Sequence, residues 1–110
     1  MQLTPLTSVA KLTAQTTTVL TVKANGGVLH AVSIYNPNAT VSYVQFFDLN
    51  TTVTLATTVP NFVLPIPAGA ASNLSNLNIG FTNGLKLAAT TTSTGNTAPS
   101  TGLDGICVYS

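Results

Sequence analysis

Two apolar-rich runs that flank an Asn-Pro-Asn turn constrain the fold of this chain more than any other feature. The first run covers residues 28–35 and the second covers residues 41–47. Both are rich in β-branched and aromatic side chains, which favour a pleated strand over a helix. Between them Pro37 presets the backbone for a turn, and the flanking Asn side chains can bond their own backbone there. We expect a β-hairpin, or two strands that meet at a tight corner, at the centre of a β-sheet.

Further short alternating runs follow, separated by turn residues. The segments 25–27 (Asn-Gly-Gly) and 83–84 (Asn-Gly) predict hairpin turns, because Asn-Gly supplies the positive φ of such turns. Pro65 restricts its run to a sheet edge. The expected strands are residues 17–24, 28–35, 41–47, 49–59, 62–66, 77–82, 85–91 and 105–109, with loops at 68–76 and 92–103. About eight short strands without a convincing helix predict an all-β, single-domain antiparallel β-sandwich of jelly-roll or Greek-key type.

The alternation also predicts which side chains fill the core. The expected buried residues are Val32, Ile34, Val44, Phe46, Leu55, Ile79, Phe81, Leu87, Ile106 and Val108. Residues 1–16 differ, because their apolar residues Leu3, Leu6, Val9 and Leu12 are spaced by three among Thr, Ser and Pro. We expect residues 1–16 to form an extended arm that packs on a neighbouring subunit, with a disordered tail as the alternative. Residues 17–110 then form the β-sandwich domain.

The chain carries very little charge. The charged residues are Lys11, Lys23, Asp48, Lys86 and Asp104, whereas a typical soluble domain has about 25% charged residues. Weak colloidal repulsion suits a subunit held inside an assembly; an extracellular domain solubilised by hydroxyls and amides is the alternative. Without a basic patch we expect no nucleic acid partner, and the uncharged tracts are interrupted too often to span a membrane. The N-terminal sequence lacks the regions of a secretory signal peptide, so we expect synthesis in a cytosol without one.

Few side chains offer chemistry. His30 is the sole histidine, and a histidine in an apolar strand is usually a hydrogen-bonded structural residue. Asp48 and Asp104 each lie at a strand end, where aspartate commonly caps a turn, so we do not expect a catalytic carboxylate pair. Cys107 is expected to be a small buried hydrophobe rather than a nucleophile, and it has no partner for an internal disulfide. No metal-ligand spacing or phosphate-binding glycine loop is present. We therefore expect no enzyme, no cofactor, and no catalytic or metal-binding residue.

One succession of motifs points to a family. The motifs, in order, are LHAVSIYNPN, VSYVQFFD, TVP, VLPIPAG, NIGFTNGLKLAAT and GICVYS. This succession resembles the small β-sandwich virion proteins of tailed bacteriophages, in which similar strand, Pro-Ala-Gly and Phe-x-x-Gly-Leu segments follow one another. The resemblance covers about residues 26–110 and leaves the N-terminal region unmatched. Its motifs build the fold, so no functional residue is carried over.

The resemblance implies a non-enzymatic assembly role in a virion, put together in the host cytoplasm. The leading hypothesis is a capsid cement or decoration protein that oligomerises on the outer capsid surface and stabilises the lattice. Its expected partners are copies of itself, preferably as a trimer, and the major capsid protein or other virion proteins. A tail or baseplate component is one alternative. A carbohydrate- or receptor-binding β-sandwich module is another, and an exposed aromatic cluster beside Asn and Asp would favour it.

Overall fold

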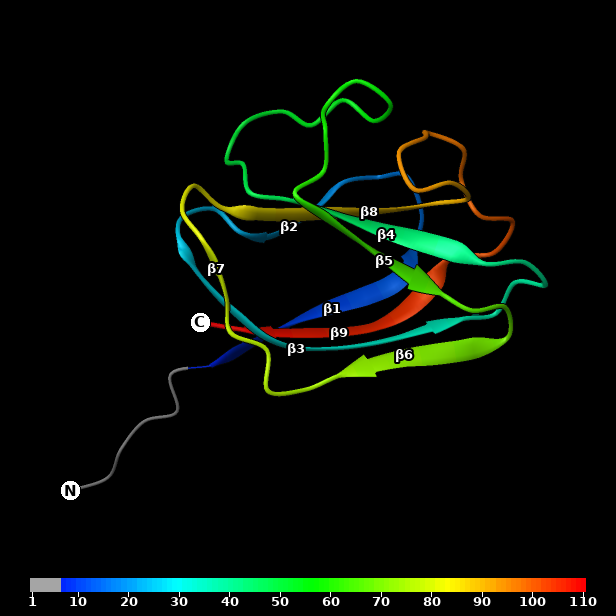
Figure 1. Cartoon of the computed structure of the whole chain (residues 1–110), viewed down its shortest axis with the longest axis horizontal. Coiled ribbons are helices and arrows are strands. Elements are labelled where there is room, and N and C mark those ends of the chain that lie inside the picture. Colours follow the sequence, from blue (N-terminus) through cyan, green and yellow to red (C-terminus); the bar gives the residue numbers. More distant parts are fainter. Residues whose placement is uncertain (1–6) are drawn as a thin grey trace.

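The protein is a two-layer β-sandwich in the computed structural model, which describes residues 7–110. Within that range the strands are β1 (Ser8–Gln15), β2 (Leu20–Lys23), β3 (Gly27–Asn36), β4 (Ser42–Phe47), β5 (Phe62–Ile66), β6 (Ala70–Leu74), β7 (Ile79–Phe81), β8 (Leu85–Thr90) and β9 (Leu103–Tyr109), and there is no helix. Sheet A has the order β1-β9-β3-β6, with β7 also paired to β3, and sheet B has the order β2-β8-β4-β5. Figure 1 shows the two sheets stacked face to face. The expected all-β sandwich is confirmed.

The Asn-Pro-Asn turn joins the two sheets. It follows β3, which lies in sheet A, and leads to β4, which lies in sheet B. Of the two structures expected here, the hairpin is wrong and the tight corner is confirmed. The turns at 25–27 and 83–84 likewise cross between sheets, since β2 and β8 belong to sheet B while β3 and β7 belong to sheet A. The predicted hairpins at these two positions are therefore also wrong.

Glycine at these corners serves close backbone approach rather than positive φ. A Cβ atom added to Gly27 would lie 2.0 Å from the carbonyl oxygen of Ser110. One added to Gly84 would lie 2.7 Å from the carbonyl oxygen of Leu49. Among the described glycines only Gly69 has a positive φ. A residue with a side chain at either corner would push apart segments that lie far apart in sequence.

Residues 8–15 are part of the domain, so the expected arm at residues 1–16 is wrong over this range. They form β1, which pairs antiparallel with β9 at the edge of sheet A. Leu12 points inward and is buried in the core, while Lys11 beside it is exposed. Val9 and Lys11 face outward and Leu12 faces inward, as in a regular strand. A register shift between Leu12 and Gln15 then places the next buried side chain three residues further on. Residues 1–6 lie outside the described residues.

Two further strand assignments differ from the structure. Residues 49–59, expected as a strand, form a loop with a turn in which the N–H groups of Thr57 and Thr58 donate to the carbonyl oxygen of Thr54. Leu55 is only partly buried as a result. Conversely, β6 lies within the segment 68–76 that was expected to be a loop. In both places the alternation was built from small residues and threonine, which occur equally in loops and on solvated strand faces.

The core lies between the sheets and matches much of the expected set. Six expected residues are buried: Val32, Ile34, Val44, Phe46, Phe81 and Leu87. Ile79 is partly buried and packs against them. The expected phase of β9 is wrong, because Cys107 faces the core while Ile106 is 38% exposed and Val108 is partly exposed on the outer face. All three residues of the run Ile-Cys-Val are apolar, so hydrophobicity alone does not show which of them face the core and which face outward.

The outer face of sheet B is covered by two loops. Gln45 on β4 points away from the core yet is fully buried. Its Nε2 donates to the hydroxyl of Thr90 at 2.8 Å and to the carbonyl oxygen of Gly95 at 3.1 Å. The Nζ of Lys86 donates to the carbonyl oxygen of Thr51 at 2.6 Å. These bonds attach the loops that follow β4 and β8, which Figure 1 shows on the side of sheet B away from sheet A.

A buried amide fixes the corner between β3 and β4. Asn36 is fully buried, and its Nδ2 donates to the carbonyl oxygens of Thr40 at 2.9 Å and Ile66 at 3.0 Å. Its Oδ1 accepts from the backbone N–H of Asn38 at 3.0 Å and from the hydroxyl of Ser42 at 3.3 Å. The bond to Asn38 is the local Asx bond that the sequence predicted. Because Ile66 ends β5, the same side chain joins two corners of the sandwich.

Asn38 extends this network to a third segment. Its Nδ2 donates to the carbonyl oxygen of Thr101, and its Oδ1 accepts from the N–H of Thr101, both at 2.8 Å. Its own carbonyl oxygen accepts from the N–H of Gly69 at 3.0 Å. Together Asn36 and Asn38 tie the β3–β4 corner, the β5–β6 corner and the approach to β9 at one end of the molecule.

We expect Phe46→Ala to lower the free energy of unfolding by about 3–5 kcal/mol, because it removes a fully buried ring. That ring stacks on Phe62 with centroids 4.5 Å apart and planes 11° apart. Urea denaturation followed by circular dichroism measures the change. Val59→Ala is the matched control, since Val59 is 82% exposed, and its change should stay within about 0.5 kcal/mol. Equal effects from the two substitutions would contradict this core.

We expect Asn36→Ala to cost about 2–4 kcal/mol of unfolding free energy. It leaves the buried carbonyl oxygen of Ile66, and partly buried backbone groups of Thr40 and Asn38, without the partner that Asn36 provides. The same urea experiment measures it. Asn50→Ala is the control, since Asn50 is exposed in the loop after β4. If the two asparagine variants were equally stable, the Asn36 amide would not hold the corners together.

Candidate functional site

His30 has the structural surroundings that the sequence suggested. It lies on β3, and its Nε2 is 2.9 Å from the hydroxyl oxygen of Ser110. The backbone of Ser110 also exchanges two hydrogen bonds with Val28, at 2.9 and 3.1 Å. The histidine therefore helps to hold the end of β9 against β3.

The structure does not bring the two carboxylates together. Asp48 accepts hydrogen bonds from the backbone N–H groups of the β7–β8 corner, at 2.8 Å from Asn83 and 3.0 Å from Thr82. Asp104 accepts from the N–H of Ala14 at 2.8 Å, close to the β1–β2 corner. Along β3, Asp104 pairs with Tyr35 near one end, while the β7–β8 corner adjoins the other end. Asp48 holds a turn, as expected, whereas Asp104 bonds the irregular end of β1 instead. The two carboxylates lie at opposite ends of the sandwich.

Cys107 faces the core between the sheets and is fully buried. Burial raises the pKa of its thiol to about 12, so the thiol stays protonated at neutral pH and is a poor nucleophile. Among residues 7–110 no cluster of three or more His, Cys, Asp or Glu side chains is placed to hold a metal ion. In that same range there is no helix with the length and apolarity needed to cross a membrane.

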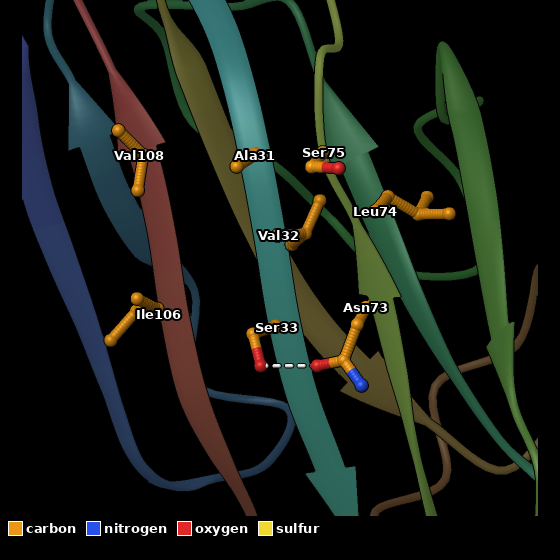
Figure 2. A pocket seen from close by; sticks show the side chains of 8 residues that line it. All are labelled: Ala31, Val32, Ser33, Asn73, Leu74, Ser75, Ile106 and Val108. Atoms are coloured by element: carbon orange, nitrogen blue, oxygen red, sulfur yellow. Dashed lines mark hydrogen bonds between the residues drawn. The ribbon is translucent and has the colours of Figure 1, made fainter.

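The outer face of sheet A carries the most distinctive surface feature, a shallow groove with a volume of about 210 Å³. Figure 2 looks onto it: Ala31 and Ser33 of β3 form the floor, and Ile106 and Val108 of β9 form one wall. The opposite wall comes from β6 and the residue after it, and includes Asn73. There Asn73 Oδ1 accepts a hydrogen bond from the hydroxyl of Ser33, drawn dashed in Figure 2. The groove arises because small residues of β3 lie between larger ones on both sides.

Exposed apolar side chains concentrate on the strands of this same sheet. Of the six large hydrophobic residues that are exposed among residues 7–110, four belong to sheet A: Val9, Tyr35, Leu74 and Ile106, with exposures of 60%, 47%, 41% and 38%. The charged residues on these strands are Lys11 and Asp104. Val9, Tyr35 and Ile106 point outward, whereas Leu74 pairs with the core residue Val32 and lies at the sheet edge. Within residues 7–110 no loop covers the outer face of sheet A (Figure 1), and this bare face contrasts with that of sheet B, which the two loops cover.

Sequence reasoning missed this surface because it assigned Ile106 and Val108 to the core. The expected burial of Cys107 carried the correct phase, because cysteine is among the residues most often fully buried and adjacent side chains of a strand point to opposite faces. Placing Cys107 inward turns its two apolar neighbours outward. The partners of β9 would still have been unknown, since it pairs with β1 and β3, distant segments of the chain.

Comparisons of the chain with protein-family models, with curated proteins and with solved structures find no match.

The backbone bonds to Asp48 generate a pH prediction. These bonds favour the charged carboxylate and hold its pKa below the ordinary value of 3.8. A lowered pKa in the folded state adds stability that is present above 3.8 and is lost as the pH falls through the folded value. We expect Asp48→Asn to unfold more easily than wild type at pH 7, with the difference shrinking well below pH 3.8. Thermal melts across this range measure it.

Asp104→Asn is the comparison variant, because Asp104 accepts one backbone hydrogen bond from Ala14 rather than bonds from a whole corner. A difference between wild type and Asp48→Asn that does not change with pH would argue against a stabilising charge at Asp48.

Proposed function

We propose that this chain is a non-enzymatic structural protein of a bacteriophage virion, a cement or decoration subunit that oligomerises on the outer capsid surface and stabilises the lattice. The observation that carries the proposal is the bare outer face of sheet A. Soluble monomers rarely expose a continuous apolar patch of more than a few hundred Å², and larger patches usually mark interaction sites. On this face the exposed side chains of Val9, Tyr35 and Ile106 lie among small and polar residues, and the strands of the sheet carry two charged residues, Lys11 and Asp104.

The rigidity of the sandwich suits a mechanical role. Cross-strand pairing, the packed core and the Asn36–Asn38 network hold the face in one shape. A preorganised face loses little conformational entropy when it binds, so more of its contact energy appears as affinity. Subunits joined through such faces can bridge neighbouring capsid proteins and resist expansion of the shell.

The resemblance to small virion proteins of tailed bacteriophages supports the proposal, and the fold gives its motifs a physical meaning. The Asn-Pro-Asn motif forms the hydrogen-bond network at the corner. The Phe-Thr-Asn-Gly-Leu motif contains the backbone N–H groups that donate hydrogen bonds to Asp48. These are requirements of the sandwich, so they fit a tail or baseplate component as well as a capsid component.

A receptor- or carbohydrate-binding module is the second candidate, and Tyr35 is the observation that favours it. Its ring is 47% exposed, with Asp104 opposite it on β9. Sugar sites commonly stack a ring on such an aromatic side chain. The other aromatic residues are buried or partly buried: Phe46, Phe47 and Phe81 fully, and Tyr43, Phe62 and Tyr109 in part. A lone exposed ring, rather than a cluster, makes assembly the better supported function.

We expect the purified protein to co-sediment with capsid shells of the virus that encodes it and to raise the temperature at which those shells rupture. Ile106→Asp should weaken this binding, because it places a charge in the apolar face. Val59→Asp is the matched control, since Val59 is exposed in a loop away from sheet A. Wild-type protein that does not bind shells would refute the cement role. Immunogold labelling confined to tails would favour the tail alternative, and binding on a glycan array abolished by Tyr35→Ala would favour the recognition module.

A further inference from the structure

The register of sheet A arranges its outward side chains in rows across the strands. In the middle row, Lys11 of β1 lies beside Ile106 of β9, which lies beside Ser33 of β3 and then Asn73 of β6. Residues that pair directly point to the same side of a sheet. From the β1 edge to the β6 edge, the row therefore contains a long cationic side chain, a large apolar one, a small hydroxyl and an amide.

The rows on either side have a related composition. One contains Val9, Val108 and Ala31, again with a large side chain on β9 and a small one on β3. The other contains Asp104 on β9 and Tyr35 on β3. In two of the rows β9 has a large apolar side chain where β3 has a small one, and in the third row β9 has a carboxylate where β3 has a phenol. The outward side chains of the two strands are therefore complementary.

We propose that this face pairs with the same face of a second copy, about a two-fold axis that runs along the strands between β9 and β3. The inference rests on the proposed role as an assembly subunit and names the partner of its bare face. Such an axis lays β9 of each copy over β3 of the other, with the sheets about 10 Å apart. Ile106 then enters the groove above Ser33 of the second copy, and Val108 lies above Ala31 of the second copy.

Polar complementarity favours this axis. It places Lys11 over the Asn73 amide of the second copy, and the hydroxyl of Tyr35 can donate to Asp104 of the second copy. One Asp104 oxygen accepts from Ala14, and the other has no hydrogen-bond partner among the described residues. A two-fold axis across the strands would instead stack Lys11 on Lys11 and Ile106 on Ile106, which joins like charges and leaves the groove empty.

The area of the face sets the strength of the pair. Four strands of about seven residues span roughly 20 Å by 23 Å, or about 450 Å² in projection. A standard stable interface buries about 800 Å² on each partner. The pair is therefore weak in dilute solution and is strengthened where subunits are concentrated on a lattice. A three-fold ring needs two different complementary surfaces, so a trimer would have to use other parts of the molecule.

The test swaps the large side chain of β9 and the small side chain of β3 that face each other in the pair. Ile106→Ser leaves small residues facing each other, and Ser33→Ile makes large residues collide, so each single variant should dimerise at least tenfold more weakly. The double variant Ile106→Ser with Ser33→Ile again places bulk over a small residue and should recover most of the affinity. Sedimentation velocity from micromolar to millimolar protein gives the dissociation constants. Val59→Ser is the control, and thermal melts check that each variant is folded.

Each outcome decides the proposal. Weakening in both single variants with recovery in the double variant supports the pair. Wild type that is monomeric at millimolar concentration, or an oligomer whose stability ignores all three variants, overturns it. Those outcomes leave the assembly role open, because binding of wild type to capsid shells tests that role separately. A second readout covers a variant that does not fold: on a Cys107→Ala background, mixed Val108→Cys and Ala31→Cys proteins should form a disulfide-linked heterodimer faster than either protein alone.

Discussion

The buried amide of Asn36 is the interaction on which the rest of the sandwich depends. It satisfies carbonyl oxygens from two different corners and receives an N–H and a hydroxyl in return. In a low-dielectric interior such a group is costly if any partner is lost, so the corners are fixed together or not at all. The amide ends β3, and β3 pairs with β6, β7 and β9. The network therefore sets where the central strand of sheet A stops and which of its residues face outward.

The sequence predicted the fold class because its information is local: alternating β-branched runs and turn residues are visible in windows of ten residues. Pairing is not local, and three of the differences follow from this. The Asn-Gly segments at 25–27 and 83–84 look like hairpin turns, yet their strands belong to different sheets. Residues 8–15 have few apolar side chains, and they form a strand because they pair with β9, the last strand of the chain. Residues 49–59 alternate like a strand but find no partner strand.

The features of the candidate site likewise divide into those that local sequence predicts and those that depend on strand pairing. The structural roles of His30 and Asp48 and the burial of Cys107 followed from residue type and position, because lone side chains without partners have few alternatives. The groove required the phase of Ile106 and its place beside Ser33, 73 residues earlier in the chain. Neighbouring apolar residues on both faces of β9 hid that phase. A surface built from three distant strands becomes visible only when their register is known.

The difference between the two outer faces gives the molecule a direction. Sheet B lies beneath loops held by Gln45 and Lys86, whereas no loop of residues 7–110 covers sheet A. In a pair that buries sheet A, the threonine-rich loops of the two copies therefore form its two outer surfaces. Those loops contribute little to the inner core, so their sequence can change without altering the buried face. If sheet A is an interface, the fold separates a surface whose residues a partner constrains from a surface whose residues can change.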